Sequence, residues 1–410
     1  MPEGSAAGGG RGMWTWRLPM ALLSGLVAVA LAACGSGDEA STESSAATAG
    51  SAAATTGSSS SSVADDALQD LYEGATFEEP PVQDPPAPKP GAKVWVVDYG
   101  LAASAGAEFA EATEAAGELM GWDVTVVDGK YNPSAYLAGI REAIAAKADA
   151  IVLYAIDCPG VRAGLQAADR AGIPVIAAES VDCDKAGEGG EAEPLFDAEV
   201  AYTQGDFLDW SRAFGEAQAV WTIAATNGEA KVINLFETDI IGLVEMNKGF
   251  VDGMAQCETC EIVETIEFLG TDLGPALQER VQQALIENPD ANAIRVPYDA
   301  IMTSGVAQAI VASGRSDDLQ VIAGEGQGPN VDLVRSGRGQ DAGIGTDITW
   351  TGYHAMDTVN RVLAGEEPVP SGIGLQVYDA EHNLPESGGW EPPIDPVPVY
   401  RSAYGAADGE

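Results

Sequence analysis

The sequence predicts an α/β protein made of two similar lobes, each a parallel sheet with helices on both faces. Apolar strand-like runs alternate with amphipathic helical segments along most of the 410 residues, and this alternation is typical of doubly wound parallel sheets. The same order of elements then occurs a second time, with matching segments at nearly constant spacing. Apolar residues make up 46% of the chain, which is enough for the cores of two or three domains.

The first lobe is expected to begin with a strand over residues 93–98 and a helix over 108–120. Phe109, Ala112 and Ala116 lie on one stripe of this helix, and Gly121 is suited to end it. The other elements expected here are strands at 123–127, 150–155 and 174–178 and helices at 133–146 and 160–171.

The second lobe is predicted to repeat this order after a connecting helix over 205–225, which carries Trp210 and Trp221 as core residues. The expected elements are strands at 231–236, 261–267, 293–296 and 320–323 and helices at 241–254, 274–287 and 300–312. Asp299 follows Asp157 by 142 residues, and Glu325 follows Glu179 by 146 residues within the related runs VIAGEG and VIAAES. The sequence therefore indicates two copies of one unit.

The start of the chain has the layout of a secretory signal. Arg11 and Arg17 precede an apolar run over 18–30, and small residues come directly before Cys34. The run is shorter than the about 20 apolar residues that a membrane-spanning helix needs. This segment resembles the lipobox of bacterial lipoproteins, which implies cleavage before Cys34 and attachment of lipid to its thiol. The alternative is an ordinary cleavage site beside an unrelated cysteine.

The segment after Cys34 lacks the residues for a core. Residues 35–62 are almost entirely Ser, Ala, Thr, Gly and acidic residues, and residues 80–90 are rich in proline. We therefore expect residues 1–33 to be a signal peptide and residues 34–91 to be a disordered tether. The folded body is then extracytoplasmic, anchored at the cell surface through the lipid on Cys34.

The formal net charge of −43 excludes one class of partner. Such a field repels phosphate backbones, so we expect no binding to nucleic acid. The acidity has two interpretations: a preference for cationic or neutral ligands, or a solvated surface suited to a salty exterior.

The four remaining cysteines form an even set in an oxidising compartment. We predict a disulfide between Cys158 and Cys183, because both follow neighbouring strands, and a second between Cys257 and Cys260 by proximity. The CETC sequence of the second pair follows a helix instead of opening one, so it lacks the feature that activates a redox thiol. A structural role is therefore expected.

Ligands of open parallel sheets bind beyond the carboxyl ends of the strands. These ends carry Tyr99, Asp157, Glu179 and Ser180 in the first lobe and Glu237, Thr238, Asp239, Tyr298, Asp299, Glu325 and Gln327 in the second. The set is rich in carboxylates and contains no arginine. Carboxylates accept hydrogen bonds from hydroxyls or amines, and aromatic faces hold sugar faces or cations. The alternative for Asp157 and Asp299 is a role as helix N-caps.

Over residues 93–378 the chain resembles the type I periplasmic solute-binding proteins of ABC transporters, especially the ribose-binding-like sugar binders. The resemblance rests on the strand at 148–156, on AGIPVIAAES and on GYHAMDTVNRVLAGEEPV. It implies two lobes joined by a three-segment hinge, with crossings near Ala201, Thr346 and Gly372.

The same resemblance assigns ligand contact to four positions, although this chain departs from the family's residue types there. These positions are Glu179, Tyr298, Glu325 and Thr346. Ser180 stands where the family has an arginine. Trp350 and Tyr99 are added to the ligand-binding set, with a place in the core as the alternative.

The expected organisation is a first lobe of residues 92–200 plus 347–372, a second lobe of 201–346 plus 373–400, and a tail over 401–410. The expected function is capture of a small polar solute, a sugar or a polyol, by hinge closure and its delivery to an ABC permease. The protein is expected to be monomeric.

Catalysis is not expected, because only two histidines occur and no nucleophile, zinc or phosphate-binding motif is present. No cofactor or metal is predicted. The alternatives are a sensor of the same fold, a binding protein for a cationic amine or aminosugar, and an exported carbohydrate hydrolase that uses two cleft carboxylates.

Overall fold

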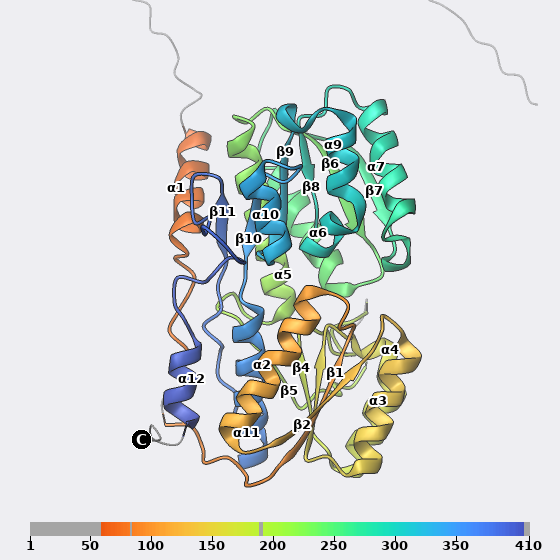
Figure 1. The fold of residues 1–410 in the computed structure, drawn as a ribbon, viewed down its shortest axis with the longest axis vertical. Helices are drawn as coiled ribbons and strands as arrows, with labels where there is room; N and C mark the ends of the chain where they lie inside the picture. Colours follow the sequence, from red (N-terminus) through yellow and green to blue (C-terminus); the bar gives the residue numbers. More distant parts are fainter. Residues whose placement is uncertain (1–58, 83, 188–191, 406–410) are drawn as a thin grey trace, which may run out of the picture. The chain divides into compact units, whose positions relative to one another are not determined.

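Two separate sheets organise the protein in the computed structural model, which describes residues 59–82, 84–187 and 192–405 (Figure 1). The first sheet is wholly parallel, in the order β2-β1-β3-β4-β5. Its strands are β1 (Lys93–Asp98), β2 (Asp123–Asp128), β3 (Ala150–Tyr154), β4 (Val175–Ala178) and β5 (Ala198–Glu199). The helices packed on it are α2 (Ser104–Met120), α3 (Pro133–Ala146), α4 (Cys158–Ala171) and α11 (Ile348–Ala364). We call this sheet and its helices the first lobe.

The second sheet has the order β11-β10-β9-β8-β6-β7, and only the edge strand β11 is antiparallel. Its strands are β6 (Lys231–Glu237), β7 (Glu261–Phe268), β8 (Ala293–Arg295), β9 (Gln320–Glu325), β10 (Ala342–Gly345) and β11 (Gln376–Asp379). Its longer helices are α5 (Phe207–Ala225), α6 (Ile241–Met254), α7 (Pro275–Glu287), α9 (Ala307–Ser313) and α10 (Gly328–Ser336). The short turns are η1 (Gly270–Asp272), α8 (Asp299–Ile301), η2 (Met302–Val306) and η3 (Ser316–Asp318). This sheet and its helices form the second lobe.

The strand orders of the two lobes correspond. The order β2-β1-β3-β4 in the first lobe matches β7-β6-β8-β9 in the second, so the predicted duplication and the two-lobed parallel α/β fold are confirmed. The expected bounds of β1, α3 and α6 agree with the structure. Helix α2 begins at Ser104, four residues before the expected start at residue 108.

Each sheet is buried on both faces, as parallel sheets require. In β1, Val94 and Val96 pack towards the side of α2 and α11, whereas Val97 packs towards α3 and α4. All five residues of β3 are buried. Trp210 and Trp221 on α5 are each 4% exposed, which confirms them as core residues.

Within residues 59–82, 84–187 and 192–405, the chain passes between the lobes at five places. Three of these passages follow β5, follow β10 and precede β11. The first and third run side by side, since the Ser371 amide donates to the Ala201 carbonyl at 2.8 Å and the Thr203 amide to the Ile373 carbonyl at 3.2 Å. The other two passages lie at the ends of the described chain, and they correct the expected boundaries.

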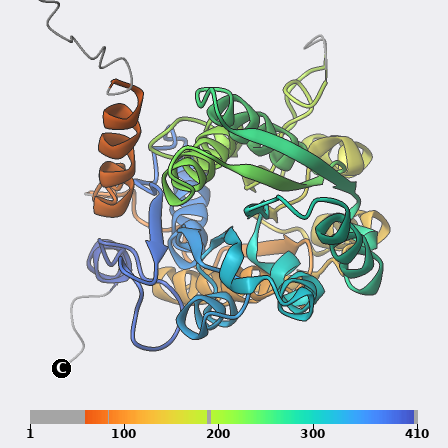
Figure 2. The ribbon, with the colours of Figure 1, turned by 90° about the horizontal axis from the view of Figure 1, so that it is seen from above.

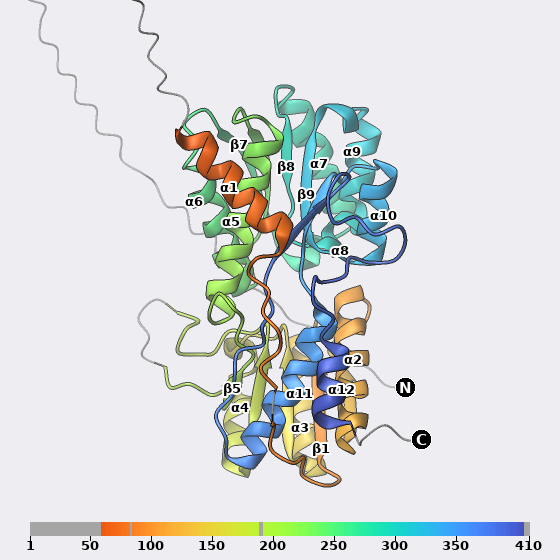
Figure 3. The same ribbon diagram turned by 90° about the vertical axis from the view of Figure 1, so that its left-hand side faces the viewer.

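The first correction concerns the expected tether. Residues Ser59–Glu73 form helix α1, which packs against α5 and β11 of the second lobe (Figures 2 and 3). Leu68, Leu71 and Tyr72 face the core at helical spacing, and the chain then buries Phe77 and Val82 on its way to β1. The prediction of a disordered segment is therefore wrong for residues 59–82. The earlier part of the tether, the signal segment and Cys34 lie outside the described residues.

The second correction concerns the end of the chain. Helix α12 (Val397–Tyr404) packs against α2 and α11 of the first lobe (Figure 3). Its Tyr400 and Tyr404 are one helical turn apart and both are buried. The expected second-lobe limit at residue 400 and the tail from residue 401 are therefore wrong for this helix.

Both predicted disulfides are confirmed. Cys158 is bonded to Cys183, and Cys257 to Cys260. The first bond ties the start of α4 to the loop after β4, and β3 and β4 are neighbouring strands as expected. Within the described ranges, no helix is long and apolar enough to cross a bilayer.

Candidate functional site

Glu179 and Glu325 occupy matching places where β4 and β9 end, one in each lobe. Both adopt positive φ angles, 50° and 84°, which are uncommon for residues other than glycine. Strained backbone of this kind is concentrated at functional sites. The Oε1 atom of Glu179 is buried and has no hydrogen-bond partner in the structure. The two carboxyl groups adjoin a shared region between the lobes, since the Glu179 carboxylate contributes to raising the pKa of Glu325 and both carboxylates contribute to raising that of Tyr99.

The carboxyl groups of this region favour the protonated form. Burial raises the pKa of Glu179 to about 7, although the Tyr154 hydroxyl lowers it. Burial, followed by the Asp299 and Glu179 carboxylates, raises the pKa of Glu325 well above its ordinary value. Burial also raises the pKa of Asp98, which ends β1, to about 7. Desolvation without a compensating cation is the physical cause in all three cases.

Tyrosine rings line the first-lobe side of this region. Tyr99 packs edge-on against Tyr131 and Tyr154 at centroid distances of 5.4 and 5.7 Å. Burial raises the pKa of Tyr99, and the Glu325 and Glu179 carboxylates raise it further. Tyr99, which was predicted as a ligand-binding residue, therefore lies within electrostatic range of the carboxylates of both lobes.

A pocket of about 460 Å³ adjoins Glu325, and we call it the cleft pocket. Its volume is in the range of sites for small molecules. Its walls come from α2, α11, the start of α10, the passage after β10 and the passage before α12. Glu325 and Thr346 are the predicted ligand-binding residues that line it. The Thr346 Oγ1 atom has no hydrogen-bond partner, and this residue is only 3% exposed.

The sequence did not indicate the other polar residues of the cleft pocket. These are Glu108, Asp347, Thr349, Glu391 and Asp395. Gln327, a strand-end residue of the sequence analysis, also lines the pocket. The Thr349 hydroxyl donates to Glu108 at 3.0 Å, and burial raises the pKa of Asp347 to about 7. The passage before α12 brings Glu391 and Asp395 to the pocket, and no local pattern in the sequence reveals that approach.

Trp390 fixes this passage against the second lobe. Its amide donates to the Gly326 carbonyl at 2.9 Å, and its indole nitrogen donates to Gln376 at 3.2 Å. A Cβ atom on Gly345 would lie 2.3 Å from the Trp390 ring, so this glycine permits the close approach. The pocket wall is therefore part of the packed core.

Asp157 joins the two lobes. Its Oδ1 atom accepts from the Val181 amide at 2.9 Å in its own lobe, and Oδ2 accepts from the Ile241 amide at 3.1 Å at the start of α6 in the other lobe. Ile240, at the N-cap of α6, has no side chain that can cap this helix. Asp157 therefore supplies a charged cap across the lobe boundary, where the helix dipole favours an anion. It does not cap α4, which was the alternative considered for it.

We expect Asp157→Asn to bind ligand about tenfold more weakly, because its amide group presents a donor to one of the two N–H donors and the closed arrangement loses a charged hydrogen bond. Isothermal titration calorimetry measures this difference. Asp169→Asn on the exposed face of α4 is the matched control and should bind like the unmodified protein. An unchanged affinity for Asp157→Asn would contradict this role.

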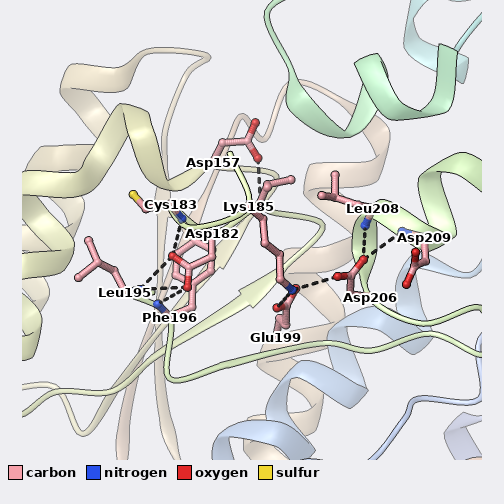
Figure 4. A network of polar contacts seen from close by, with 11 residues as sticks. Asp157, Asp182, Cys183, Lys185, Leu195, Phe196, Glu199, Asp206, Leu208 and Asp209 are labelled. Carbon is pink, nitrogen blue, oxygen red and sulfur yellow. Dashed lines mark hydrogen bonds and ion pairs between the residues drawn. The ribbon is translucent and has the colours of Figure 1, made fainter. Parts of the chain in front are cut away.

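A second contact between the lobes lies beside the first-lobe edge (Figure 4). Lys185 donates to Glu199 of β5 at 2.5 Å and to Asp206 at 3.0 Å. Asp206 also caps α5 by accepting from the amides of Leu208 and Asp209. Although burial lowers it, the pKa of Lys185 is raised above its ordinary value by these two carboxylates. The positive charge of Lys185 is thus compensated by Glu199 and Asp206.

Several predicted ligand-binding residues have other partners. Asp299 accepts from the amides of Gly324 and Gln327, and the Ser180 hydroxyl bridges the Ile156 amide and the Ala178 carbonyl. Trp350 is 0% exposed and donates to the Ser371 carbonyl, so the structure places it in the core and not in the cleft.

The remaining predicted residues lie at the end of β6 and beside the same region, since the Tyr99 and Glu325 side chains contribute to raising the pKa of Tyr298, after burial and the Glu237 carboxylate. The Tyr298 hydroxyl donates to Glu237 at 2.7 Å, and burial raises the pKa of Glu237 to about 7. Asp239 is exposed and accepts from the Gly270 amide at 3.2 Å. The Tyr298 hydroxyl and one carboxylate oxygen of Glu237 are therefore hydrogen-bonded to each other within the second lobe.

Metal binding finds little support in the described ranges. The group of donor atoms close enough to share an ion consists of Cys158, Asp182 and Cys183. Both sulfur atoms are already joined in a disulfide, and Asp182 accepts from the amides of Cys183, Leu195 and Phe196 (Figure 4). These atoms serve the local fold.

Residues 103–367 match the profile of a periplasmic binding protein domain. Since this match spans well over half of the chain, the protein belongs to the periplasmic binding protein family. No curated protein sequence matches it.

Solved structures show the same fold at low sequence identity. An ABC sugar transporter subunit from Rhodobacter sphaeroides has a TM-score of 0.59 and 20% identity, and the match covers 72% of this chain and 99% of that one. An ABC transporter periplasmic solute-binding protein from Actinobacillus succinogenes with bound D-allose gives 0.61 and 18%, covering 72% and 98%. An ABC transporter solute-binding protein from Agrobacterium vitis with bound allitol gives 0.57 and 18%, covering 70% and 95%.

Proposed function

We propose that this protein is the substrate-binding component of an ABC importer and that it captures a sugar or polyol between its lobes. The observation that supports this most strongly is the pair Glu179 and Glu325, which stand at matching strand ends of the two lobes with positive φ angles, and of which Glu179 has a buried carboxyl oxygen without a partner. The proteins of the same fold with bound D-allose and allitol agree with such a ligand.

Hinge closure is the mechanism that the contacts favour. A ligand that touches both lobes shifts the population towards the closed form. Asp157 adds a hydrogen bond from the Ile241 amide of the other lobe, which separation of the lobes would break. Tyr99, Glu179, Glu325 and Thr346 are the residues that we assign to the ligand. Asp157 and Asp299 act on the fold around it.

The proposal also covers the cellular location of the protein, its oligomeric state and its partner. We assign the protein to the outer side of the cell membrane, held by lipid on Cys34, as a monomer that delivers its ligand to a permease. The lobes that we infer are residues 92–200 with 347–372 and residues 201–346 with β11, with the first lobe extended by α12.

A thermal-shift screen of sugars and polyols on the purified protein tests the function. A ligand at about 100 times its dissociation constant adds about 2.7 kcal/mol of stability, which raises the melting temperature by about 5 to 10 °C for domains of this size. The screen should return at least one such shift without turnover of the ligand. Appearance of a hydrolysis product would instead indicate the hydrolase alternative.

The same screen tests the site. Glu179→Ala and Glu325→Ala should each lose most of the ligand-induced shift, because each removes a hydrogen-bonding carboxyl group from one lobe. Glu142→Ala and Glu279→Ala are matched controls on exposed helix surfaces and should keep it. Full responses from both cleft variants would show that the ligand binds elsewhere.

A further inference from the structure

We propose that the ligand carries a positively charged nitrogen in addition to hydroxyl groups, and that this nitrogen is held by Glu179 and Glu325. The ligand class is then an amino sugar or an amino polyol. This inference rests on the proposed function and makes its ligand class more specific.

The first argument is the sign of the charged groups around the cleft pocket. Five carboxylates line it, and no lysine, arginine or histidine does. They come from α2, β9, the passage after β10 and the passage before α12, and they are Glu108, Glu325, Asp347, Glu391 and Asp395. Glu179 and Asp98 approach from the ends of β4 and β1. The charged side chains around the site are therefore all negative.

The second argument is the absence of a protein cation for these groups. Within the described ranges, the ion pairs involve other carboxylates, and none includes Glu179, Glu325 or Asp98. Arg295 is fully buried in the second lobe, where it donates to Gln218 at 2.7 Å and to the Leu235 carbonyl at 3.1 Å. Lys185 is bound by Glu199 and Asp206.

The third argument is independent of charge and concerns hydrogen bonding. Thr346 is 3% exposed and lines the cleft pocket, and its hydroxyl has no partner. Asp98 is 0% exposed, and its Oδ2 atom also lacks a partner, as does Oε1 of Glu179. Buried polar atoms without partners are rare in folded proteins. They indicate a ligand with several hydrogen-bond donors.

A cation satisfies these groups better than a neutral molecule does. Burial raises the pKa of both Glu179 and Glu325, and the Glu179 carboxylate raises that of Glu325 further, so with a neutral ligand the protonated form stays favoured. An ammonium group donates to both carboxylates and lets both ionise. A divalent metal is a poorer candidate, since among the described residues these carboxylates do not converge on one coordination sphere.

Matched solutes test the charge of the ligand. The pairs are D-glucitol with glucamine, D-glucose with D-glucosamine and D-galactose with D-galactosamine, and the N-acetyl derivatives of both amino sugars remove the charge but keep the nitrogen. Calorimetry on the full chain should show at least one amino member binding about tenfold or more tightly than its neutral and N-acetyl counterparts. For glucamine, the affinity should rise between about pH 6 and pH 8 as the cleft carboxyls ionise.

The outcomes separate this inference from the proposed function. A neutral member that binds as tightly as its amino counterpart overturns the inference and leaves sugar or polyol capture intact. Binding of putrescine or choline, with none of the hydroxylated solutes, supports the charge and overturns the sugar or polyol assignment. The absence of binding by every probe contradicts both.

A second experiment does not depend on the identity of the ligand. Because burial raises the pKa of Glu179 to about 7 and that of Glu325 well above its ordinary value, the stability of the ligand-free protein should fall from about pH 5 to pH 8. Glu179→Gln and Glu325→Gln should therefore melt a few degrees higher than the unmodified protein at about pH 8. Glu142→Gln and Glu279→Gln, on exposed helices, should not. Melting temperatures that are unchanged or lower in both cleft variants overturn the inference.

Discussion

Asp357→Ala is expected to lower the free energy of unfolding by about 3 to 5 kcal/mol. Asp357 is 0% exposed on α11; it accepts from the Arg361 guanidinium at 2.8 Å and from the Tyr404 hydroxyl of α12. Its removal leaves Arg361 buried without its main partner and leaves the Tyr404 hydroxyl without an acceptor. Urea unfolding followed by fluorescence gives the difference in free energy.

The matched control for Asp357 is Glu366, which follows the C-cap of the same helix. Glu366 also approaches Arg361, at 3.8 Å, but its side chain is 52% exposed. Exposed ion pairs contribute little, so Glu366→Ala should change stability by less than about 1 kcal/mol. Equal losses for the two variants would show that burial of the pair is not what stabilises it.

Replacing both Cys158 and Cys183 by serine is expected to cost about 3 to 4 kcal/mol, because the bond closes a loop across a sequence separation of 25 residues. The loss should also weaken ligand binding. Cys158 directly follows Asp157, and the bonded loop includes Glu179, so the bond holds the ligand-facing edge of the first lobe. Thermal unfolding and calorimetry of the double variant measure the two effects.

The second disulfide provides the control. Cys257 and Cys260 are only three residues apart and lie in the turn between α6 and β7, far along the chain from the cleft residues. A short loop gives a smaller entropic effect, so the corresponding double serine variant should lose about 1 to 2 kcal/mol and keep its affinity. A loss of affinity in this variant would mean that reduced stability alone weakens binding.

The strands and helices of the repeated part of the fold could be predicted from the sequence, because each has a clear hydrophobic periodicity of its own. Helices α3 and α6 and strand β1 could be placed to the residue for this reason. The flanking helices were missed because their signals are weak. In α1, Leu68, Leu71 and Tyr72 stand among Ser, Ala and Asp residues whose composition suggested disorder.

The candidate site divides in the same way. Glu179 and Glu325 were found because the repeat placed them at equivalent strand ends. Asp157 and Asp299 also occupy matching positions in the two repeats. Asp157 nevertheless accepts from the Ile241 amide of the other lobe, whereas Asp299 accepts from amides within its own lobe. Glu391 and Asp395 line the cleft pocket from the segment between β11 and α12. Such approaches depend on tertiary packing, and no spacing along the sequence encodes them.

The two end helices pack on different lobes, so a pair of labels on them would report the distance between the lobes. Helix α1 packs against the second lobe and α12 against the first. A fluorescent donor on the exposed Gln69 and an acceptor on the exposed Ser402 would therefore be attached to different lobes. Energy transfer between the two dyes then reports how the distance between the lobes changes when ligand binds, and neither label lies near the ligand.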